Sequence, residues 1–109
     1  MIIKTSENFC IITPISNSIN NREALRLQEE LTNNEGYDIA LDLSYVEDCS
    51  IDFIELLKSA HNISLFNISS DIFALFYAMG IDRLANLFVS ELDFKANKHR
   101  LLQRNFKII

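Results

Sequence analysis

The chain has 109 residues, of which 49% are hydrophobic, and a formal net charge of −5. This length predicts a single domain, residues 1–109, and the apolar content excludes a disordered chain. No apolar run reaches the roughly 18 to 20 residues that span a bilayer, and residues 1–4 do not begin a signal peptide, so we expect a cytoplasmic protein without direct membrane insertion.

The charges are unevenly distributed along the chain. Of the basic residues, five follow Phe94, where there is no acidic residue at all. The strongly acidic body indicates that nucleic acid is not the partner, because phosphate backbones attract basic surfaces. The basic tail is more typical of a solvated helix face than of a phosphate-binding patch.

Two short strands are expected first, at residues 2–4 and 9–13, with polar residues between them. They predict an edge hairpin. Asn20 then precedes Glu23 by three residues, which is typical of a helix N-cap, and an apolar stripe follows until residues 33–36 end the helix.

The next strand, residues 37–43, is apolar on both faces and suits the centre of a sheet. Asp42 on this strand is expected to accept a hydrogen bond, since an unpaired buried carboxylate is costly. A polar turn, residues 47–50, leads to a second helix with Ser50 as its N-cap. The apolar side of this helix is expected to comprise Ile51, Phe53, Ile54, Leu56, Leu57 and Ala60.

The alternation continues with a strand at residues 63–66 and a third helix opened by Ser69, Ser70 and Asp71. Its inner side is expected to contain Ile72, Leu75, Phe76 and Met79, before Gly80 ends it. A strand at residues 87–89 and a fourth helix capped by Ser90 follow, and a final strand is expected at residues 106–109. The inner stripe of the fourth helix is expected to include Leu92, Ala96 and Leu101.

This order predicts an α/β domain with a four- to five-stranded mixed, mostly parallel sheet flanked by about four helices. The only cysteines, Cys10 and Cys49, lie in no CxxC or Cys/His cluster, so neither a disulfide framework nor a zinc site is expected. No glycine-rich phosphate loop is present, and we expect no cofactor.

One combination of residues extends from residue 37 to residue 90. It comprises Leu41-Asp42-Leu43-Ser44, Val46, the turn, Ile54-Glu55-Leu56-Leu57, Ile63-Ser64-Leu65-Phe66-Asn67-Ile68, Ile72, Phe76, Gly80-Ile81-Asp82 and Phe88-Val89-Ser90. This combination resembles the STAS domain of bacterial anti-sigma factor antagonists and of sulfate transporter tails. In that family a serine in the turn accepts phosphate from a partner kinase that is also the anti-sigma factor.

The phosphoacceptor motif of that family is degenerate here. Laid on the family pattern without gaps, Ser50 takes the position of the aspartate, Ile51 that of the phosphoacceptor serine and Phe53 that of the glycine. Ile51 has no hydroxyl group, so the usual phosphoswitch cannot operate at that position. Ser50 is the alternative phosphorylation candidate, because a phosphate there would gain from the helix N-terminus, although it also has a role as the N-cap.

The turn is also rich in acidic side chains, namely Glu47, Asp48, Asp52 and Glu55. They are more typical of a solvated rim than of converging metal ligands, so we expect no metal site, although an enzyme that uses this acidic turn is one alternative. No nucleophile lies beside a base in the sequence, and no catalytic residue is expected.

The resemblance implies a non-enzymatic interaction module that docks an anti-sigma factor or kinase through the second helix. The expected partner contacts are Asp48, Cys49, Ser50, Ile51, Asp52, Phe53, Ser69 and Ser70. An accessory subunit of a membrane ABC transporter for lipids is the alternative within the family. A second copy of the chain is a further candidate partner.

Overall fold

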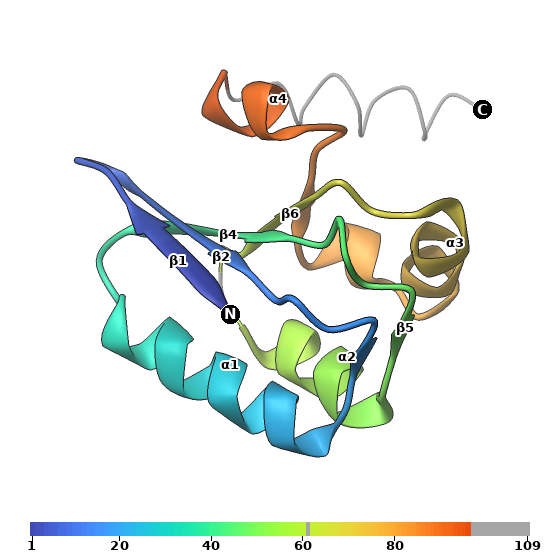
Figure 1. Ribbon diagram of the computed structural model, residues 1–109. Coiled ribbons are helices and arrows are strands. Elements are labelled where there is room, and N and C mark those ends of the chain that lie inside the picture. The colour runs from blue at the N-terminus through green and yellow to red at the C-terminus, as the bar shows by residue number, and fades with distance from the viewer. Residues whose placement is uncertain (61, 97–109) are drawn as a thin grey trace.

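The computed structural model describes residues 1–60 and 62–96. Its main sheet has the strand order β1-β2-β4-β6-β7 (Figure 1). The strands are β1 (Ile2–Thr5), β2 (Phe9–Thr13), β4 (Asp38–Asp42), β6 (Ser64–Phe66) and β7 (Asn86–Leu87). β1 pairs with β2 in antiparallel fashion, and every other pair is parallel. The predicted hairpin and the mixed, mostly parallel sheet are confirmed.

Four α-helices lie among the described residues, as predicted. They are α1 (Asn21–Asn33), α2 (Ile51–Ser59), α3 (Ser70–Ala78) and α4 (Glu91–Lys95), with a short 3-10 helix, η1 (Ile81–Arg83), after α3. Each α-helix begins with a side-chain cap that accepts a hydrogen bond from a backbone N–H three residues later. The caps are Asn20, Ser50, Ser69 and Ser90.

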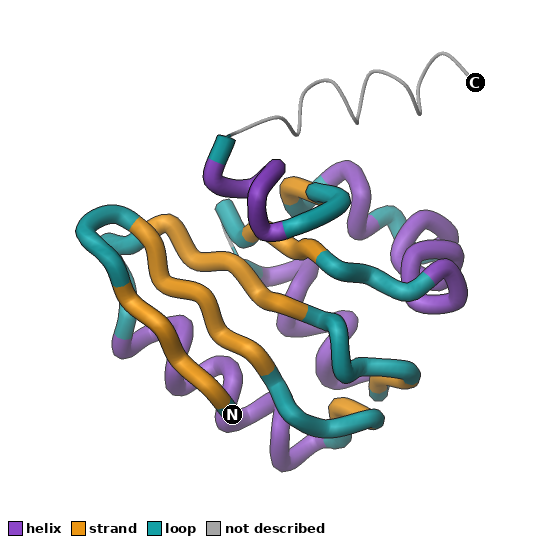
Figure 2. Tube along the Cα trace, turned by 45° about the horizontal axis from the view of Figure 1, so that its top comes forward, coloured by secondary structure: helices purple, strands orange, loops and turns teal. Residues whose placement is uncertain are grey.

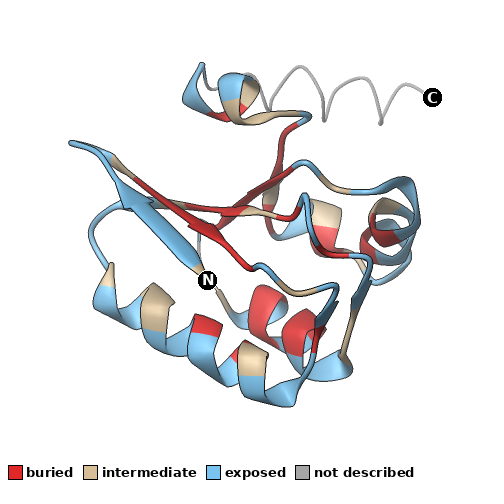
Figure 3. Cartoon of the chain, in the orientation of Figure 1, coloured by how far each residue is buried: buried red, intermediate tan, exposed pale blue. Residues whose placement is uncertain are grey.

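The larger hydrophobic core lies between one face of the sheet and the helices α1, α2 and α3. Leu27 of α1, Phe53 of α2 and Phe76 of α3 have no exposed surface and belong to the same cluster as Leu41 of β4. Figure 3 shows this burial in α2 and in the central strands, whereas β1 at the edge of the sheet is exposed. The core therefore holds the helices that follow β3, β5 and β6 in fixed positions.

The opposite face of the sheet carries α4 and a second core, so the sheet has helices on both sides (Figure 2). The ring of Phe94 lies 5.1 Å from Phe9, 5.9 Å from Phe66 and 5.5 Å from Phe88 between ring centroids. The prediction for the fourth helix was wrong in its inner residues, because α4 has only five residues and turns Phe94 inward. Leu92 is 75% exposed and Ala96 is exposed, while Leu101 lies outside the described residues.

Several apolar residues predicted to be buried are exposed. Ile51 is 76% exposed because it is the first residue of α2 and lies beyond the sheet edge. Leu75 of α3 is 36% exposed, and Met79, the C-cap of α3, is 40% exposed. The strand predicted at residues 87–89 is observed as β7, Asn86–Leu87, and Val89 lies beyond its end and is 64% exposed. The strand predicted at residues 106–109 lies outside the described residues. No helix in the described part is long and apolar enough to cross a membrane.

Candidate functional site

The turn before α2 is held by a small second sheet that the sequence did not predict. Strands β3 (Ser18–Ile19) and β5 (Asp48–Cys49) pair in parallel, apart from the main sheet. The flanking residues extend this pairing: the N–H of Glu47 donates to the carbonyl of Asn17 (2.7 Å), and the N–H of Ser50 donates to that of Ile19 (2.9 Å). Because β3 leads directly into α1 and β5 into α2, the pairing brings the two helix starts side by side.

Ser50 and Ile51 have different environments although they are adjacent. The Oγ of Ser50 accepts a hydrogen bond from the N–H of Phe53 (3.3 Å), and its carbonyl accepts one from the N–H of Ile54 (3.3 Å). Ser50 is half-buried and acts as the predicted N-cap, whereas the side chain of Ile51 projects from the first position of the helix and is 76% exposed. A rigid backbone therefore presents a β-branched apolar side chain to solvent.

Phe53 lies beneath this surface and not on it. Its side chain has no exposed area, and its ring centroid lies 6.4 Å from that of Phe76 in α3. The expected partner contact at Phe53 is corrected accordingly, since this position points inward from the first turn of α2. The ring fixes α2 against α3 and thereby supports the exposed residues above it.

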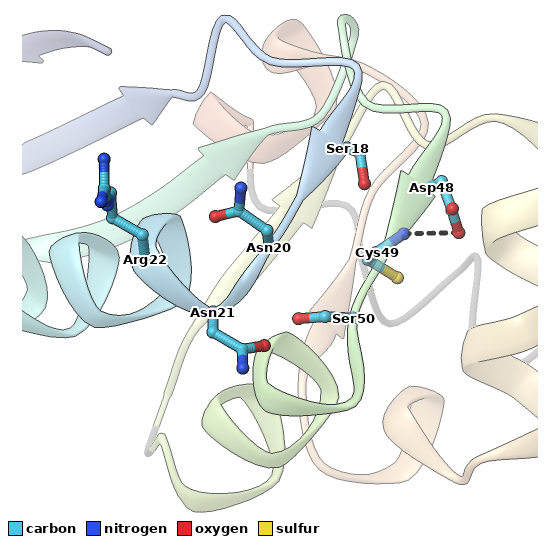
Figure 4. A pocket seen from close by; sticks show the side chains of 7 residues that line it. All are labelled: Ser18, Asn20, Asn21, Arg22, Asp48, Cys49 and Ser50. Carbon is cyan, nitrogen blue, oxygen red and sulfur yellow. Dashed lines mark hydrogen bonds between the residues drawn. The ribbon is translucent and has the colours of Figure 1, made fainter.

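The starts of α1 and α2 share an open hollow of about 640 Å³. Figure 4 shows side chains from both helix starts and from β3 and β5 around it. Its lining comprises Ser18, Asn20, Asn21, Arg22, Asp48, Cys49 and Ser50. The sequence identified Asn20 as a cap but did not predict that it, Asn21 and Arg22 lie near the turn, because only the β3–β5 pairing connects these segments. The one sign of this pairing in the sequence is Ile19, a single apolar residue among polar neighbours.

Cys49 in this hollow is held in the thiol form. Burial, and next the negative charge of Asp48, raise the pKa of Cys49 to about 11. The same Asp48 carboxylate accepts a hydrogen bond from the N–H of Cys49 through Oδ1 (2.9 Å). A thiol that stays protonated at neutral pH is a poor nucleophile, so the arrangement does not favour cysteine catalysis.

The turn before α3 lies at the same edge of the sheet, after β6. Ser69 caps α3 by accepting from the N–H of Ile72 (3.3 Å), and both Ser69 and Ser70 are exposed. The loops after β4 and β6 are linked because Oδ1 of Asp42 accepts a hydrogen bond from Nδ2 of Asn67 (3.1 Å). The same oxygen accepts from the N–H of Ser44 (3.1 Å), which confirms the predicted role of Asp42 as an acceptor.

The acidic side chains of the turn do not converge. Glu47, Asp48, Asp52 and Glu55 are all exposed. Within residues 1–60 and 62–96, no group of three His, Cys, Asp or Glu side chains is placed to hold a metal ion. This edge of the sheet therefore carries exposed acidic side chains together with exposed apolar ones, of which Ile51 is the most exposed at 76%.

Comparison with known proteins rests on structure, since neither a protein-family model nor a curated protein sequence matches the chain. The crystal structure of a candidate anti-sigma factor antagonist from Thermotoga maritima superimposes with a TM-score of 0.72 and 19% sequence identity, covering 88% of this chain and 92% of that chain. The chain has the STAS fold. The NMR structure of the same Thermotoga protein gives a TM-score of 0.71 at 16% identity, with 90% and 86% of the two chains covered.

The STAS fold also relates the chain to part of a membrane protein. The murine solute carrier 26 family member A9 anion transporter, in its inward-facing state, superimposes with a TM-score of 0.59 at 19% identity. The match covers 94% of this chain but 18% of the transporter. The predicted resemblance in residues 37–90 is thus confirmed at the level of the fold.

Proposed function

We propose that this chain is a non-enzymatic protein-interaction module that docks a regulatory kinase or anti-sigma factor in the cytoplasm. The docking surface would comprise the start of α2 and the adjoining turns, with Asp48, Ile51 and Asp52 at its centre and Ser69 and Ser70 at its border. The observation that carries the proposal is the exposure of Ile51, 76%, on a backbone fixed by the β3–β5 pairing and the Ser50 cap.

Ile51 suits the role of an anchor residue on physical grounds. Full burial of an isoleucine side chain against a partner contributes about 1.5 to 3 kcal/mol. Little conformational entropy is lost when the residue is already held in place before binding. The carboxylates of Glu47, Asp48, Asp52 and Glu55, in the same segment, are exposed and favour a partner surface that carries basic residues beside an apolar contact.

The same position supports a constitutive interaction. Ile51 stands where the family keeps its phosphoacceptor serine, so phosphate transfer at that position cannot release the partner. Ser50 remains the candidate for a displaced switch, because its hydroxyl lines the hollow at the N-terminus of α2. Mass spectrometry of the native protein tests this directly: phosphate on Ser69, Ser70 or another residue, and none on Ser50, would remove the displaced switch.

The docking proposal is tested by affinity capture with the full chain and two variants. We expect the wild-type chain to capture a GHKL-type kinase or anti-sigma factor and Ile51→Asp to reduce the captured amount about tenfold, since an anchor loses its apolar contact and gains a buried charge. Leu84→Asp is the matched control, because Leu84 is 52% exposed and lies before β7, away from this edge. Equal capture by Ile51→Asp and wild type would refute the docking surface.

The similarity to a domain of the murine anion transporter favours a second candidate, an accessory subunit of a membrane ABC transporter for lipids. That function uses the same kind of docking without a phosphoserine. The identity of the captured protein separates the two candidates: a permease or transporter ATPase supports the second, and a kinase supports the first. The genes beside the coding sequence provide an independent check of the same distinction.

A further inference from the structure

A groove lies between α1 and α2 and continues from the docking surface proposed above. It consists of two adjoining hollows of about 550 and 500 Å³, which are both lined by Gln28 of α1 and by Leu56 and Ser59 of α2. Asp52 of the docking surface lines the larger hollow, and Asn21 lines both that hollow and the one at the turn. The α1–α2 groove therefore begins at the docking surface and follows the two helices, which lie side by side in Figure 1.

The α1–α2 groove runs along the helix axes. Its lining residues recur at intervals of three and four, which is the spacing of one face of a helix. They include Leu25, Gln28 and Thr32 on α1 and Asp52, Leu56 and Ser59 on α2. Since α1 has 13 residues and is about 20 Å long, an occupant that fills the groove has a length of this order.

The α1–α2 groove combines apolar side chains with unpaired carboxylates. Leu25 is 62% exposed although it is a large apolar residue, and Tyr37 at the far end of the groove is 41% exposed. Neither hollow is lined by a lysine or arginine of the described residues, and within those residues no salt bridge involves the carboxylates that line it. These carboxylates are all exposed and belong to Glu35, Asp38, Asp52 and Glu55. By charge complementarity the groove fits a segment that is both apolar and basic.

We propose that the α1–α2 groove binds an amphipathic basic helix of the docking partner. The inference rests on the proposed function, because it treats the groove as the continuation of that docking surface. The occupant is a helix because the groove has helical walls, whose backbone groups are bonded within each helix and offer none to an extended chain. Its apolar side chains, at i, i+3, i+4 and i+7, contact Leu25 and Leu56, and its lysine or arginine side chains face Asp52 and Glu55.

A designed peptide tests the groove before the partner is identified. The peptide has about 14 residues, with leucine at the i, i+3, i+4 and i+7 positions of a helix and lysine on both sides of that stripe. A scrambled peptide of the same composition lacks the stripe and is the control. We expect fluorescence anisotropy with the full chain to give a dissociation constant about tenfold lower for the amphipathic peptide, rising as salt is added. Equal binding of the two peptides would overturn the proposal.

Variants of the chain locate the peptide contact. Leu25→Lys and Glu55→Lys are each expected to raise the dissociation constant about tenfold, because both place a positive charge opposite the lysines of the peptide. Leu84→Lys and Glu7→Lys make the same changes at exposed positions outside the groove and should alter it less than about twofold. Circular dichroism verifies that each variant is folded. Controls that weaken binding as much as the groove variants would show that the contact lies elsewhere.

Affinity capture separates this inference from the docking function. Loss of the captured kinase or anti-sigma factor in both Ile51→Asp and Leu25→Lys supports the docking surface and its extension into the groove. Loss in Ile51→Asp with full capture by Leu25→Lys would overturn the groove and leave the docking surface intact. A wild-type chain that captures neither kind of protein would overturn the docking function, and the peptide titration then still measures the preference of the groove.

Discussion

Ser50 and Ile51 are adjacent in the turn but have different roles. Ser50 satisfies a backbone N–H at the start of α2, and Ile51 is left exposed because the first position of the helix lies outside the core. The cap holds the backbone that carries Ile51. A change at residue 50 therefore acts on stability, and a change at residue 51 acts on the surface.

Replacement of the Ser50 cap should destabilise the protein. We expect Ser50→Ala to lower the free energy of unfolding by about 1 kcal/mol, because the N–H of Phe53 loses its acceptor. Urea denaturation measures the change. Ser50→Asn, which keeps an acceptor, should retain most of the stability, and Ser70→Ala, at an exposed position just inside α3, should change it by less than about 0.5 kcal/mol. An equal loss of stability in Ser50→Ala and Ser70→Ala would contradict the role of Ser50 as the N-cap of α2.

The raised pKa of Cys49 leads to a prediction about how stability and thiol reactivity depend on pH. Its pKa in the folded protein is raised from 9.0 to about 11, first by burial and then by Asp48, so the folded state keeps the proton more firmly than the unfolded state does. Stability linked to Cys49 is present below pH 9 and is lost as the pH rises from 9 through 11. The rate of alkylation by iodoacetamide, followed residue by residue by mass spectrometry, should rise with a midpoint near pH 11 in the folded protein.

Two controls accompany the alkylation experiment. The urea-unfolded chain should show the ordinary midpoint near pH 9, and Asp48→Asn should move the folded midpoint downward, since one of the two causes is removed. A folded midpoint at pH 9 would contradict the burial of the thiol.

At the scale of elements, short segments have effects larger than their length suggests. The two-residue strands β3 and β5 align the starts of α1 and α2, and the five-residue helix α4 covers the second core through one side chain. A helix as short as α4 is not stable in water by its own hydrogen bonds. A pair of two-residue strands likewise has too few hydrogen bonds to be stable alone. Their positions come from long-range contacts.

The dependence of α4 on Phe94 is a testable example. We expect Phe94→Ala to lower the free energy of unfolding by about 3 kcal/mol, because Phe9, Phe66 and Phe88 lose their common ring contact. Hydrogen exchange should show that the amides of α4 lose protection while those of α2 retain it. Leu92→Ala, at a position that is 75% exposed, is the control and should change stability by less than about 0.5 kcal/mol. Similar losses in both variants would mean that α4 packs differently.

At the scale of the whole molecule, the sheet separates two surfaces with different charge and burial. One side holds three helices and the acidic turn, and the other side holds α4. The docking surface proposed above therefore belongs to the three-helix side.

The prediction of a single domain, residues 1–109, is tested by calorimetry. Because both cores share the central strands β2, β4 and β6, we expect one cooperative transition. Its calorimetric enthalpy should be about 70 kcal/mol near 60 °C and should equal the van't Hoff enthalpy in dilute solution. Two resolved transitions, or a van't Hoff enthalpy well below the calorimetric value, would contradict a single domain.

The sequence by itself determined the helix caps, the central strands and the order of elements. Asn20, Ser50 and Ser69 act through neighbours three residues away, and β4 is apolar on both faces, so local pattern was sufficient. It also led to the STAS resemblance that structural comparison confirmed as a fold. Ile51, by contrast, was assigned both to the apolar side of the second helix and to the expected partner contacts, and the sequence did not decide between the two.

Only the tertiary structure decided which side chains reach the surface at the turn. The β3–β5 pairing, the inward position of Phe53 and the choice of Phe94 over Leu92 as the buried residue of α4 depend on contacts between segments distant in sequence. Two-residue strands and five-residue helices have no periodicity from which their packing follows. For this reason the sequence located the turn, and the fold determined that Ile51 is the residue it presents.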